Sequence, residues 1–494
     1  MSNKDLYSKL LYRTYNLKHW IPKEIHNLNN IIKAADYLKI NYNGTFNFQG
    51  KYVDKYNLKK NTQYVHVTGT NGKGSVTKKI DKALSLAGIK TGRFTSPHIC
   101  SFLERITINT HNLITKDYVE RRLNDILNCK DNNKFDISFF DTLTLLMLDY
   151  FQNQNVEIAL VEVGCGGILD STNIINPLIS IVTTIGYDHM NVLGYTKREI
   201  SKNKSGIFKL NTPALIGPNV EPIDVFVDKA KELNCDLSVM KNADVYNESF
   251  EEENKAIAKQ ALIILREKYD KYLFGGRLTD EIINEGIKIK QDCRMEDVIE
   301  KVGMINIINI NKSLNNYNRS KDYKLKVFLD VAHNEQGLNK VFKQISYEYP
   351  DYYIRVVCGF SGNKDIESLM KIILSNVNKV YFGVSDNHRL LKEEEYFIII
   401  KKLKEQFVFK TNNSYYQHQY IDITNPEIDK DYYTEDIIST KNVGSIDDTI
   451  KKCFKEICYK KEIVLITGSF FIMKDARLTL GYNDFCDPFI IMEK

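Results

Sequence analysis

The sequence predicts two α/β domains whose sheets are mainly parallel. Its length of 494 residues exceeds what one ordinary hydrophobic core supports. Between Val65 and Gly217, short apolar runs alternate with helical patterns, as strands and helices do in a parallel sheet. A second series of this kind begins at Lys326. We therefore predict an N-terminal domain over residues 1–300 and a C-terminal domain over residues 301–494.

The glycine-rich segment at 65–77 is the most informative stretch of the chain. An alternating apolar run (Val65, Val67) leads into closely spaced glycines, and a helical pattern then runs to Gly88. Glycines let backbone N–H groups turn toward an anion, Lys73 adds positive charge, and the helix dipole favours a negative group at its start. The loop differs from the common phosphate loop because Gly74 separates Lys73 from Ser75. It predicts a nucleotide-phosphate site, with a plain strand–helix connection as the alternative.

Two further apolar runs, Val156–Val163 and Leu178–Ile185, read as buried parallel strands. Ligands gather at the carboxyl ends of such strands. Glu162 ends the first run, His189 follows the second, and Ser96 follows another apparent strand. A buried glutamate is costly unless it is paired or coordinating, and phosphoryl transfer needs a metal with such ligands. These three residues are candidate metal ligands, although a lone histidine is more often structural.

The remaining elements are assigned from the same patterns. A helix is expected at Glu251–Lys268, and the strands of the second domain are expected at Lys326–Val331, Tyr353–Phe360, Lys379–Val384 and Glu462–Thr467. Two polar segments lack clean periodicity, and we interpret them as an insertion or linker at 306–322 and as a mainly inserted loop at 411–445.

Composition excludes several classes of protein. The net charge of +5 is small and no basic block stands out, so nucleic acid is not an expected partner. No apolar run is long enough to span a bilayer, so no membrane association is expected. The nine cysteines form no CxxC pairs, which favours reduced thiols and a cytoplasmic protein. The basic start leaves a mitochondrial pool open, although Asp5 and the lack of an Arg-rich amphipathic pattern argue against it.

Several blocks of the sequence resemble motifs of the Mur ligase superfamily, most closely its folylpolyglutamate synthase and dihydrofolate synthase branch. The loop G-T-N-G-K-G-S at 69–75 is similar to the ATP loop of that branch. The other matching blocks follow in family order and are Thr95–Ile108 (TSPHxxxxxERIxI), Glu162–Asn173 (EVGxGGRLDATN), Ile185–Ile207 (IGxDHxxxLGxTxxxIAxEKAGI), Cys293–Glu296 (GRxE), Asp330–Asn334 (DGAHN) and Gly468–Ser469 (GS).

The resemblance implies a P-loop ATPase-like N-terminal domain and a Rossmann-like C-terminal domain of Mur ligase type. It implies ATP-dependent ligation of L-glutamate to dihydropteroate and to tetrahydrofolate and its polyglutamates. A carboxylate must be activated before an amine attacks it, so the expected route is an acyl phosphate formed with ATP and Mg²⁺. Leu169, Asp170 and Ser171 resemble the form found in enzymes that accept dihydropteroate, which favours a bifunctional enzyme. A monomer is the family default.

The resemblance also implies roles for single residues. Those expected to bind the nucleotide are Thr70, Asn71, Gly72, Lys73, Gly74, Ser75, Asn254, Arg294 and Asp330. Those expected to hold magnesium are Ser96, Glu162 and His189, with a second site at Lys204 if that lysine is carbamylated. Those expected to act in catalysis are Lys73, His189, Lys204, Arg294 and His333.

The expected substrate contacts come from two regions. Ser469 and His333 are placed near the incoming amino acid, where a helix cap or core contact is the alternative. The acceptor is expected at Ser138, Phe139, Phe140, Asp141, Leu169, Asp170 and Ser171, with a phenylalanine ring stacking on the pterin. For each ring a place in the helix core is an equal alternative. For Lys204 and Asn254 the alternative interpretation is an ordinary solvent-exposed position.

The sequence departs from the family motifs at four positions. Ile168 stands in place of arginine, Asn203 in place of glutamate, and Cys293 and Val331 each in place of glycine. None of these is an expected metal or phosphate ligand.

Four alternative functions remain. A monofunctional folylpolyglutamate synthase would not use dihydropteroate. A cell-wall Mur ligase would act on a UDP-linked peptide, but the TSPH and LDSTN blocks match the folate branch better. A nucleotide-binding switch would turn over without glutamate and would not need Glu162 and Lys204 together. An inactive paralogue would be expected to lack loop or metal residues, and these are present.

Overall fold

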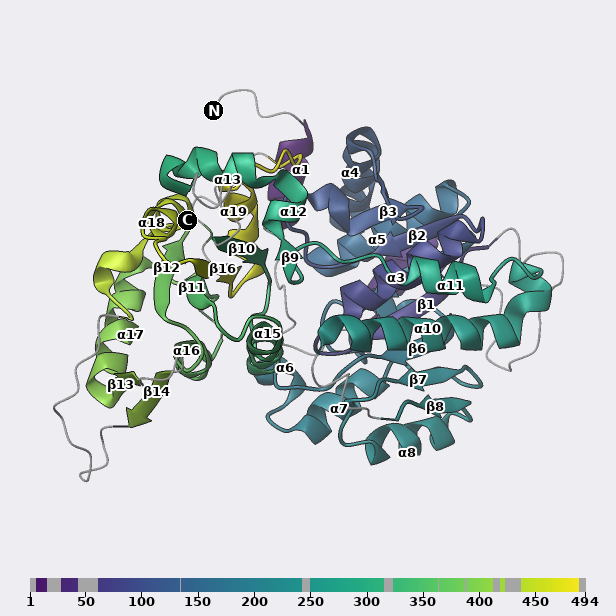
Figure 1. Cartoon of the computed structure of the whole chain (residues 1–494). Coiled ribbons are helices and arrows are strands. Elements are labelled where there is room, and N and C mark those ends of the chain that lie inside the picture. Colours follow the sequence, from purple (N-terminus) through teal and green to yellow (C-terminus); the bar gives the residue numbers. More distant parts are fainter. Residues whose placement is uncertain are drawn as a thin grey trace. The chain divides into compact units, whose positions relative to one another are not determined.

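The computed structural model describes residues 6–15, 28–42, 61–133, 135–241, 249–314, 323–362, 364–385, 387, 389–411, 418–422 and 437–487 (Figure 1). The chain divides into two compact units, the first ending at Gln291 and the second beginning at Asp292. This division lies slightly before the boundary near residue 300 that the sequence suggests. Each unit is an α/β structure with its own sheet, as predicted.

Unit 1 is built on an eight-stranded sheet with the order β4-β3-β2-β5-β1-β6-β7-β8. The strands are β1 Gln63–Thr68, β2 Thr91–Phe94, β3 Ile106–Ile108, β4 Asn112–Leu113, β5 Ile158–Glu162, β6 Pro177–Val182, β7 Ala214–Ile216 and β8 Leu237–Val239. Pairing is parallel from β2 to β8 and antiparallel at β3 and β4. Because β1 lies between β5 and β6, the segments that follow these three strands leave the sheet at one edge.

Helices cover both faces of this sheet (Figure 1). They are α1 Leu6–Tyr15, α2 Leu28–Tyr37, α3 Lys73–Leu86, α4 Lys116–Asn133, α5 Phe139–Asn153, α6 Met190–Leu193, α7 Lys197–Ser205, α8 Asp224–Glu232, α10 Phe250–Tyr269 and α11 Asp280–Gly286, with short turns η1 Phe102–Arg105, η2 Ser171–Ile174 and η3 Asp270–Phe274. Alternate residues of β1 face different cores: Tyr64 packs with the α4 and α5 side, and Val65 and Val67 pack with the α3 and α10 side. Burial on both faces extends to every residue of β1, the polar Gln63, His66 and Thr68 included.

Unit 2 has a six-stranded sheet with the order β15-β12-β11-β16-β10-β9. The strands are β9 Glu296–Asp297, β10 Lys324–Leu329, β11 Tyr353–Cys358, β12 Lys379–Val384, β15 Val443–Ser445 and β16 Lys461–Thr467, and β13 Phe407–Thr411 pairs separately with β14 His418–Asp422. The helices are α12 Val298–Val302, α13 Met304–Ile310, α15 Glu335–Glu348, α16 Ile366–Leu374, α17 Glu393–Gln406, α18 Ile446–Lys455 and α19 Met473–Thr479, with η4 Lys312–Leu314, η5 Thr440–Asn442 and η6 Phe470–Ile472. Only β9 runs antiparallel to its neighbour in the six-stranded sheet.

Both segments interpreted as insertions contain regular structure. Helix α13 occupies the start of 306–322 and buries Ile307 and Ile308, while 315–322 lie outside the described residues. In 411–445, β14 completes a hairpin and β15 joins the main sheet, while 412–417 and 423–436 lie outside the described residues. Interspersed asparagines obscure the helical hydrophobic periodicity of α13. A strand as short as β15 depends on pairing with its neighbour for stability.

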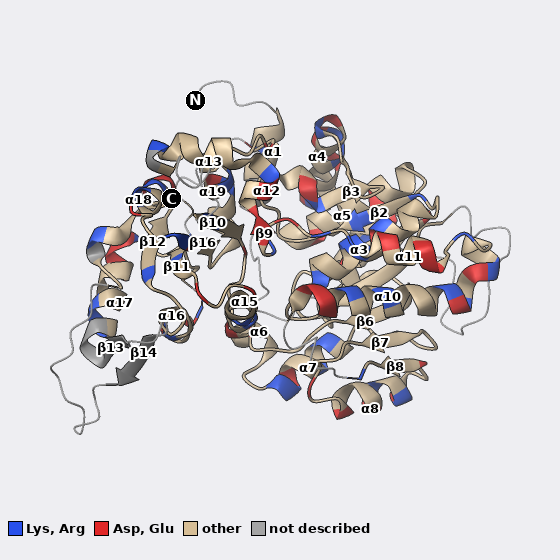
Figure 2. Cartoon of the chain, viewed as in Figure 1, with Lys and Arg blue, Asp and Glu red and all other residues tan. Residues whose placement is uncertain are grey.

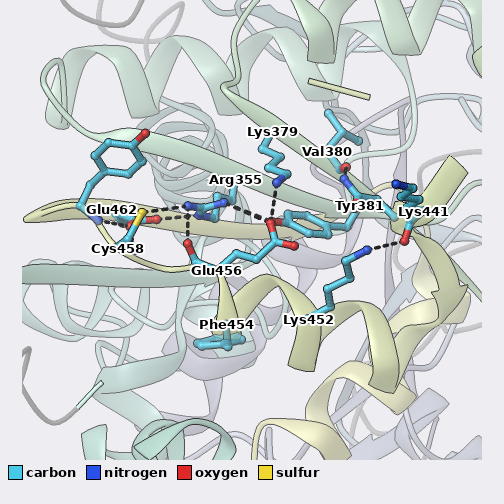
Figure 3. A network of polar contacts seen from close by, with 12 residues as sticks. Arg355, Lys379, Val380, Tyr381, Lys441, Lys452, Phe454, Glu456, Cys458 and Glu462 are labelled. Carbon is cyan, nitrogen blue, oxygen red and sulfur yellow. Dashed lines mark hydrogen bonds and ion pairs between the residues drawn. The ribbon is translucent and has the colours of Figure 1, made fainter. Parts of the chain in front are cut away.

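A buried polar network ties the strands of unit 2 together (Figure 3). The guanidinium of Arg355 donates to Glu462 Oε2 at 2.6 Å and to the carbonyl oxygen of Glu456 at 2.7 Å. Tyr381 donates to the Glu456 carboxylate at 2.7 Å, and Lys379 pairs with the same group at 2.5 Å. Since each charge faces an opposite charge or a hydrogen-bond partner, the network reads as structural.

Charge is spread over both units. Figure 2 shows acidic and basic residues interspersed along the helices. Within the described ranges, no helix combines the length and apolar character needed to cross a membrane.

Candidate functional site

The loop between β1 and α3 has the geometry of an anion cradle. Gly72 caps α3 with a φ of 89°, in the left-handed region that favours glycine. The first helical hydrogen bond runs from Val76 N to Gly72 O, so the N–H groups of residues 73–75 lie ahead of the helical ladder. A Cβ atom on Gly72 would stand 2.4 Å from Asn254 Oδ1. Asn254 is thus buried against the loop and does not occupy a solvated helix position.

The segment that follows β6 holds this loop in place. Thr183 donates to the carbonyl oxygen of Asn71 at 2.6 Å, and Asn71 N donates to Thr184 Oγ1 at 3.0 Å. Gly186 N donates to Thr70 Oγ1 at 2.9 Å. No sequence motif marks these two threonines, although their position directly after a buried strand is an available signal.

Two lysines converge on one carbonyl oxygen of the loop. Lys73 Nζ donates to Gly69 O at 3.0 Å and to Thr70 O at 3.1 Å, and Lys204 Nζ donates to Gly69 O at 2.9 Å. Burial and the nearby charge of Lys73 lower the pKa of Lys204 to about 7. With 4% of its surface exposed, Lys204 is not the surface lysine that was the alternative interpretation. The Lys73 ammonium group and the helix N-terminus form a donor set suited to phosphate oxygens.

Two of the three expected metal ligands meet beside the loop. Glu162 ends β5 and is buried, and its Oε2 accepts the N–H of Ser96 at 3.1 Å. A Cβ atom on Gly74 would lie 3.4 Å from the same oxygen. A buried carboxylate this close to the start of α3 fits a divalent cation that also contacts the phosphates.

His189 stands at the end of the segment that follows β6. It adopts the left-handed conformation with a φ of 50° just before α6. Its N–H donates to Asp188 Oδ1 at 2.8 Å, and the charge of Asp188 acts on Lys204. Among the described residues no three His, Cys, Asp or Glu side chains form a ready metal site.

The residues expected at the acceptor site separate into buried and accessible groups. Phe139 is 1% exposed and packs in the core under Arg105, so it is not available to stack on a ligand. Phe140 is half-buried, and a Cβ atom on Gly164 would stand 2.5 Å from its ring. Leu169 is 40% exposed. Phe140 and Leu169 are the apolar side chains that a ligand could reach.

The polar residues of the acceptor region bind one another. Ser138 and Asp141 form the capping box of α5, and Ser171 Oγ donates to Asp141 Oδ1 at 2.7 Å. Asp170 is buried and accepts the N–H of Cys165 at 2.9 Å and of Thr172 at 3.0 Å. In this arrangement the Asp170 carboxylate organises its own loop and does not face outward.

Lys209, which contacts the end of the acceptor region, makes the free energy of unfolding depend on pH. Its Nζ donates to the carbonyl oxygen of Asn173 at 2.8 Å, and burial lowers its pKa from 10.5 to about 8. Between these values the unfolded chain holds a proton that the folded chain has lost, so the free energy of unfolding rises with pH. We expect Lys209→Met to lack this rise, as measured by urea unfolding across the range. Exposed Lys231→Met is the control, and equal slopes in wild type and Lys209→Met would contradict the assignment.

In unit 2, the expected residues gather where β10 and β16 end. Asp330 follows β10, is buried, and accepts the N–H groups of Met295 at 2.8 Å and Ala332 at 2.7 Å. Burial raises the pKa of Asp330, while the charge of Arg294 opposes the shift. Within this unit, Arg294, Asp330 and His333 are therefore close together.

Phe470 is a member of this group that the sequence did not reveal. The Arg294 guanidinium lies 5.0 Å from its ring centre, and the His333 ring lies 5.8 Å from it. Ser469 caps η6, and its hydroxyl lies 3.3 Å from that of Ser361. The helix cap that was the alternative interpretation of Ser469 is therefore present. Ser469 also lies at the carboxyl edge of the sheet, and its contact with substrate is a separate proposal.

The four departures from the motifs are accommodated locally. Cys293 has a φ of 52°, which explains the glycine of the family motif at this position. Val331 is buried and donates its N–H to Cys293 O at 3.1 Å. The carbonyl oxygen of Asn203 accepts the N–H of Ile168 at 3.1 Å. The Ile168 side chain is 44% exposed, in a position where arginine would add a charge to the surface.

Comparison with known proteins agrees with this geometry. Residues 67–264, which include the loop, Glu162, His189 and Lys204, match the sequence model of the Mur ligase middle domain. This part of the chain is a Mur ligase middle domain. The Mur ligase membership predicted from the motifs is confirmed.

Two similar relatives carry names from one branch of the superfamily. Dihydrofolate synthase/folylpolyglutamate synthase of Bacillus subtilis is 26% identical over 450 residues, which are 85% of this chain and 91% of that protein. Folylpolyglutamate synthase of Lacticaseibacillus casei is 37% identical over 182 residues, 35% of this chain and 42% of that protein.

Two solved structures share the fold. Mycobacterium tuberculosis folylpolyglutamate synthase complexed with ADP superposes with a TM-score of 0.70 at 19% identity, covering 97% of this chain and 100% of that one. E. coli FolC in complex with DHPP and ADP superposes with a TM-score of 0.69 at 20% identity, covering 97% and 98%. The predicted Mur ligase-type fold is confirmed.

Proposed function

We propose that this enzyme ligates L-glutamate to folate-type carboxylates with ATP, using both dihydropteroate and tetrahydrofolate polyglutamates as acceptors. The observation that carries the proposal is the convergence of Lys73, Lys204 and the α3 N-terminus on one loop beside the buried Glu162. Relatives that bear the names of both activities align over most of the chain, at 85% and 84% of its length.

The chemistry follows from what these groups can do. The acceptor carboxylate attacks the γ-phosphorus of ATP, ADP leaves, and an acyl phosphate forms; the amino group of glutamate then attacks the acyl carbon and phosphate leaves. Lys73 and the N–H groups of residues 73–75 stabilise charge on the transferred phosphoryl group. Ser96, Glu162 and His189 would hold magnesium, which when bound neutralises phosphate charge.

Lys204 has the properties that carbamylation requires. A neutral amine is the form that adds carbon dioxide, and a pKa of about 7 leaves a large share of Lys204 neutral near neutral pH. The resulting carbamate would exchange a repelling cation for a carboxylate-like ligand. We propose that this carbamate helps to hold a second magnesium ion.

The other assignments rest on position in each unit. Asn71, Asn254, Arg294 and Asp330 are proposed to bind the nucleotide, and His333 and Ser469 the incoming glutamate. Phe140, Leu169 and Ser171 are proposed to contact the pteridine-bearing acceptor. We place the protein in the cytoplasm as a monomer, because all nine cysteines are unpaired thiols and a monomer is the family default.

The test is ATP-dependent incorporation of labelled L-glutamate, with dihydropteroate and tetrahydrofolate in parallel reactions. We expect product from both acceptors. Product from tetrahydrofolate alone would reduce the function to a folylpolyglutamate synthase. ATP hydrolysis that does not depend on glutamate, with no ligated product, would instead support a nucleotide-binding switch.

A further inference from the structure

His66 is a buried histidine in β1 that the proposed chemistry does not use. It is fully buried, and its Nε2 lies 2.8 Å from the hydroxyl oxygen of Thr172. That hydroxyl in turn donates to Asp170 Oδ1 at 2.5 Å. The three side chains form a line from the centre of the sheet to the loop between β5 and η2.

The order of donors in this line follows from chemistry. A hydroxyl has one proton, and the Thr172 hydroxyl gives it to Asp170, because a carboxylate can only accept. Nε2 of His66 must therefore donate to the Thr172 oxygen. The ring is then the neutral tautomer with its proton on Nε2, and its pKa, which burial lowers to about 3, keeps it neutral.

The other ring nitrogen, Nδ1, gives histidine no advantage over an apolar side chain at this position. No described residue offers Nδ1 of His66 a hydrogen-bond partner, although the atom is buried. A buried unsatisfied acceptor is destabilising, so an apolar side chain would suit the core better at this position. The single hydrogen bond from Nε2 is the contribution that distinguishes histidine from leucine here.

The line ends in the loop that carries the proposed acceptor residues. Asp170 Oδ2 accepts the N–H of Cys165, and Thr68, two residues after His66 on the same face of β1, donates to Gly166 O at 2.6 Å. Ser171, in the same region, donates its hydroxyl proton to Asp141. The nucleotide loop is held by other residues, those that follow β6.

We propose that His66 is a positioning residue for the acceptor: through Thr172 and Asp170 it holds the 164–172 loop in the conformation that binds the pteridine-bearing substrate. The inference rests on the proposed function. It gives His66, three residues before Gly69 in the chain, a role through the 164–172 loop, because its one donor points to Thr172 in that loop.

The test uses His66→Leu and Thr172→Val in the full-length chain, with exposed His111→Leu as the matched control. We expect each of the two variants to raise the KM for dihydropteroate about tenfold, the loss of one hydrogen bond to a charged network. The KM for ATP should stay within about twofold of wild type. The double variant should be no worse than either single one, since both break the same line.

His66→Gln supplies the conservative variant, because its amide can donate from nearly the same place as Nε2. We expect it to restore most of the acceptor KM, which a purely structural role would not predict. NMR of isotope-labelled histidine, with His66→Leu assigning the signal, should show the proton on Nε2. A proton on Nδ1, or unchanged acceptor KM in folded His66→Leu and Thr172→Val, would overturn the inference. If the wild-type chain forms no ligated product at all, the proposed function fails, while the NMR result still decides the tautomer.

Discussion

Glu162→Gln is expected to lower glutamate ligation at least about a hundredfold while leaving the fold intact. The amide keeps an oxygen that can accept the Ser96 N–H, so the local hydrogen bond survives. It removes the buried negative charge that would hold magnesium. A bound metal stabilises transition-state charge by several kcal/mol, and each 1.4 kcal/mol corresponds to about a tenfold change in rate. The measurement is labelled-glutamate incorporation at saturating substrates, with circular dichroism to verify folding.

Glu267→Gln is the matched control, because Glu267 is exposed on α10 and has no part in the site. Raising the magnesium concentration should recover part of the Glu162→Gln activity if the defect is weaker metal binding. Full activity of Glu162→Gln at ordinary magnesium would remove Glu162 from the proposed metal ligands.

Lys204→Ala is expected to reduce ligation by about a hundredfold or more, and added short-chain carboxylates such as acetate should restore part of it. The truncation removes both the amine on Gly69 O and the carbamate we propose. A small carboxylate that enters the resulting space can replace the carbamate as a metal ligand, worth several kcal/mol of charge stabilisation. The measurement is ligation rate against carboxylate concentration.

Lys202→Ala, on the exposed face of the same helix, should show neither the loss nor the rescue. Isotope-labelled bicarbonate should give a carbamate NMR signal in wild type that Lys204→Ala lacks. Loss of activity without rescue and without a carbamate signal in wild type would leave Lys204 as a plain cation beside the phosphates.

Local pattern was sufficient to predict the strands and the loop around the nucleotide site. The runs that become β5 and β6 are mostly apolar because both faces of those strands are buried, and β1 is marked by its alternating valines. Gly72 is needed for the left-handed backbone angle of the loop. Such signals lie within a few residues of one another. The helix at α13 and the strands β14 and β15 were missed, because short elements in polar segments gain their stability from distant partners.

The residues of the candidate site also divide into those that local sequence marks and those that distant contacts define. Glu162, Lys73 and Asn254 could be predicted as site residues because a motif or a position in an element marks them. Thr183 and Thr184 were missed, because an ordinary pair of threonines becomes a clamp only where β6 lies beside β1.

By itself the sequence determined the α/β class, the phosphate loop and the family, since these depend on local periodicity and contiguous motifs. Only the tertiary structure decided that Lys204 is buried on Gly69 O, that Phe139 is core while Phe140 is accessible, and that His66 donates to Thr172. Burial, pKa and the direction of a hydrogen bond are set by groups far apart in the chain. Side chains of the same type acquire different chemistry from those surroundings.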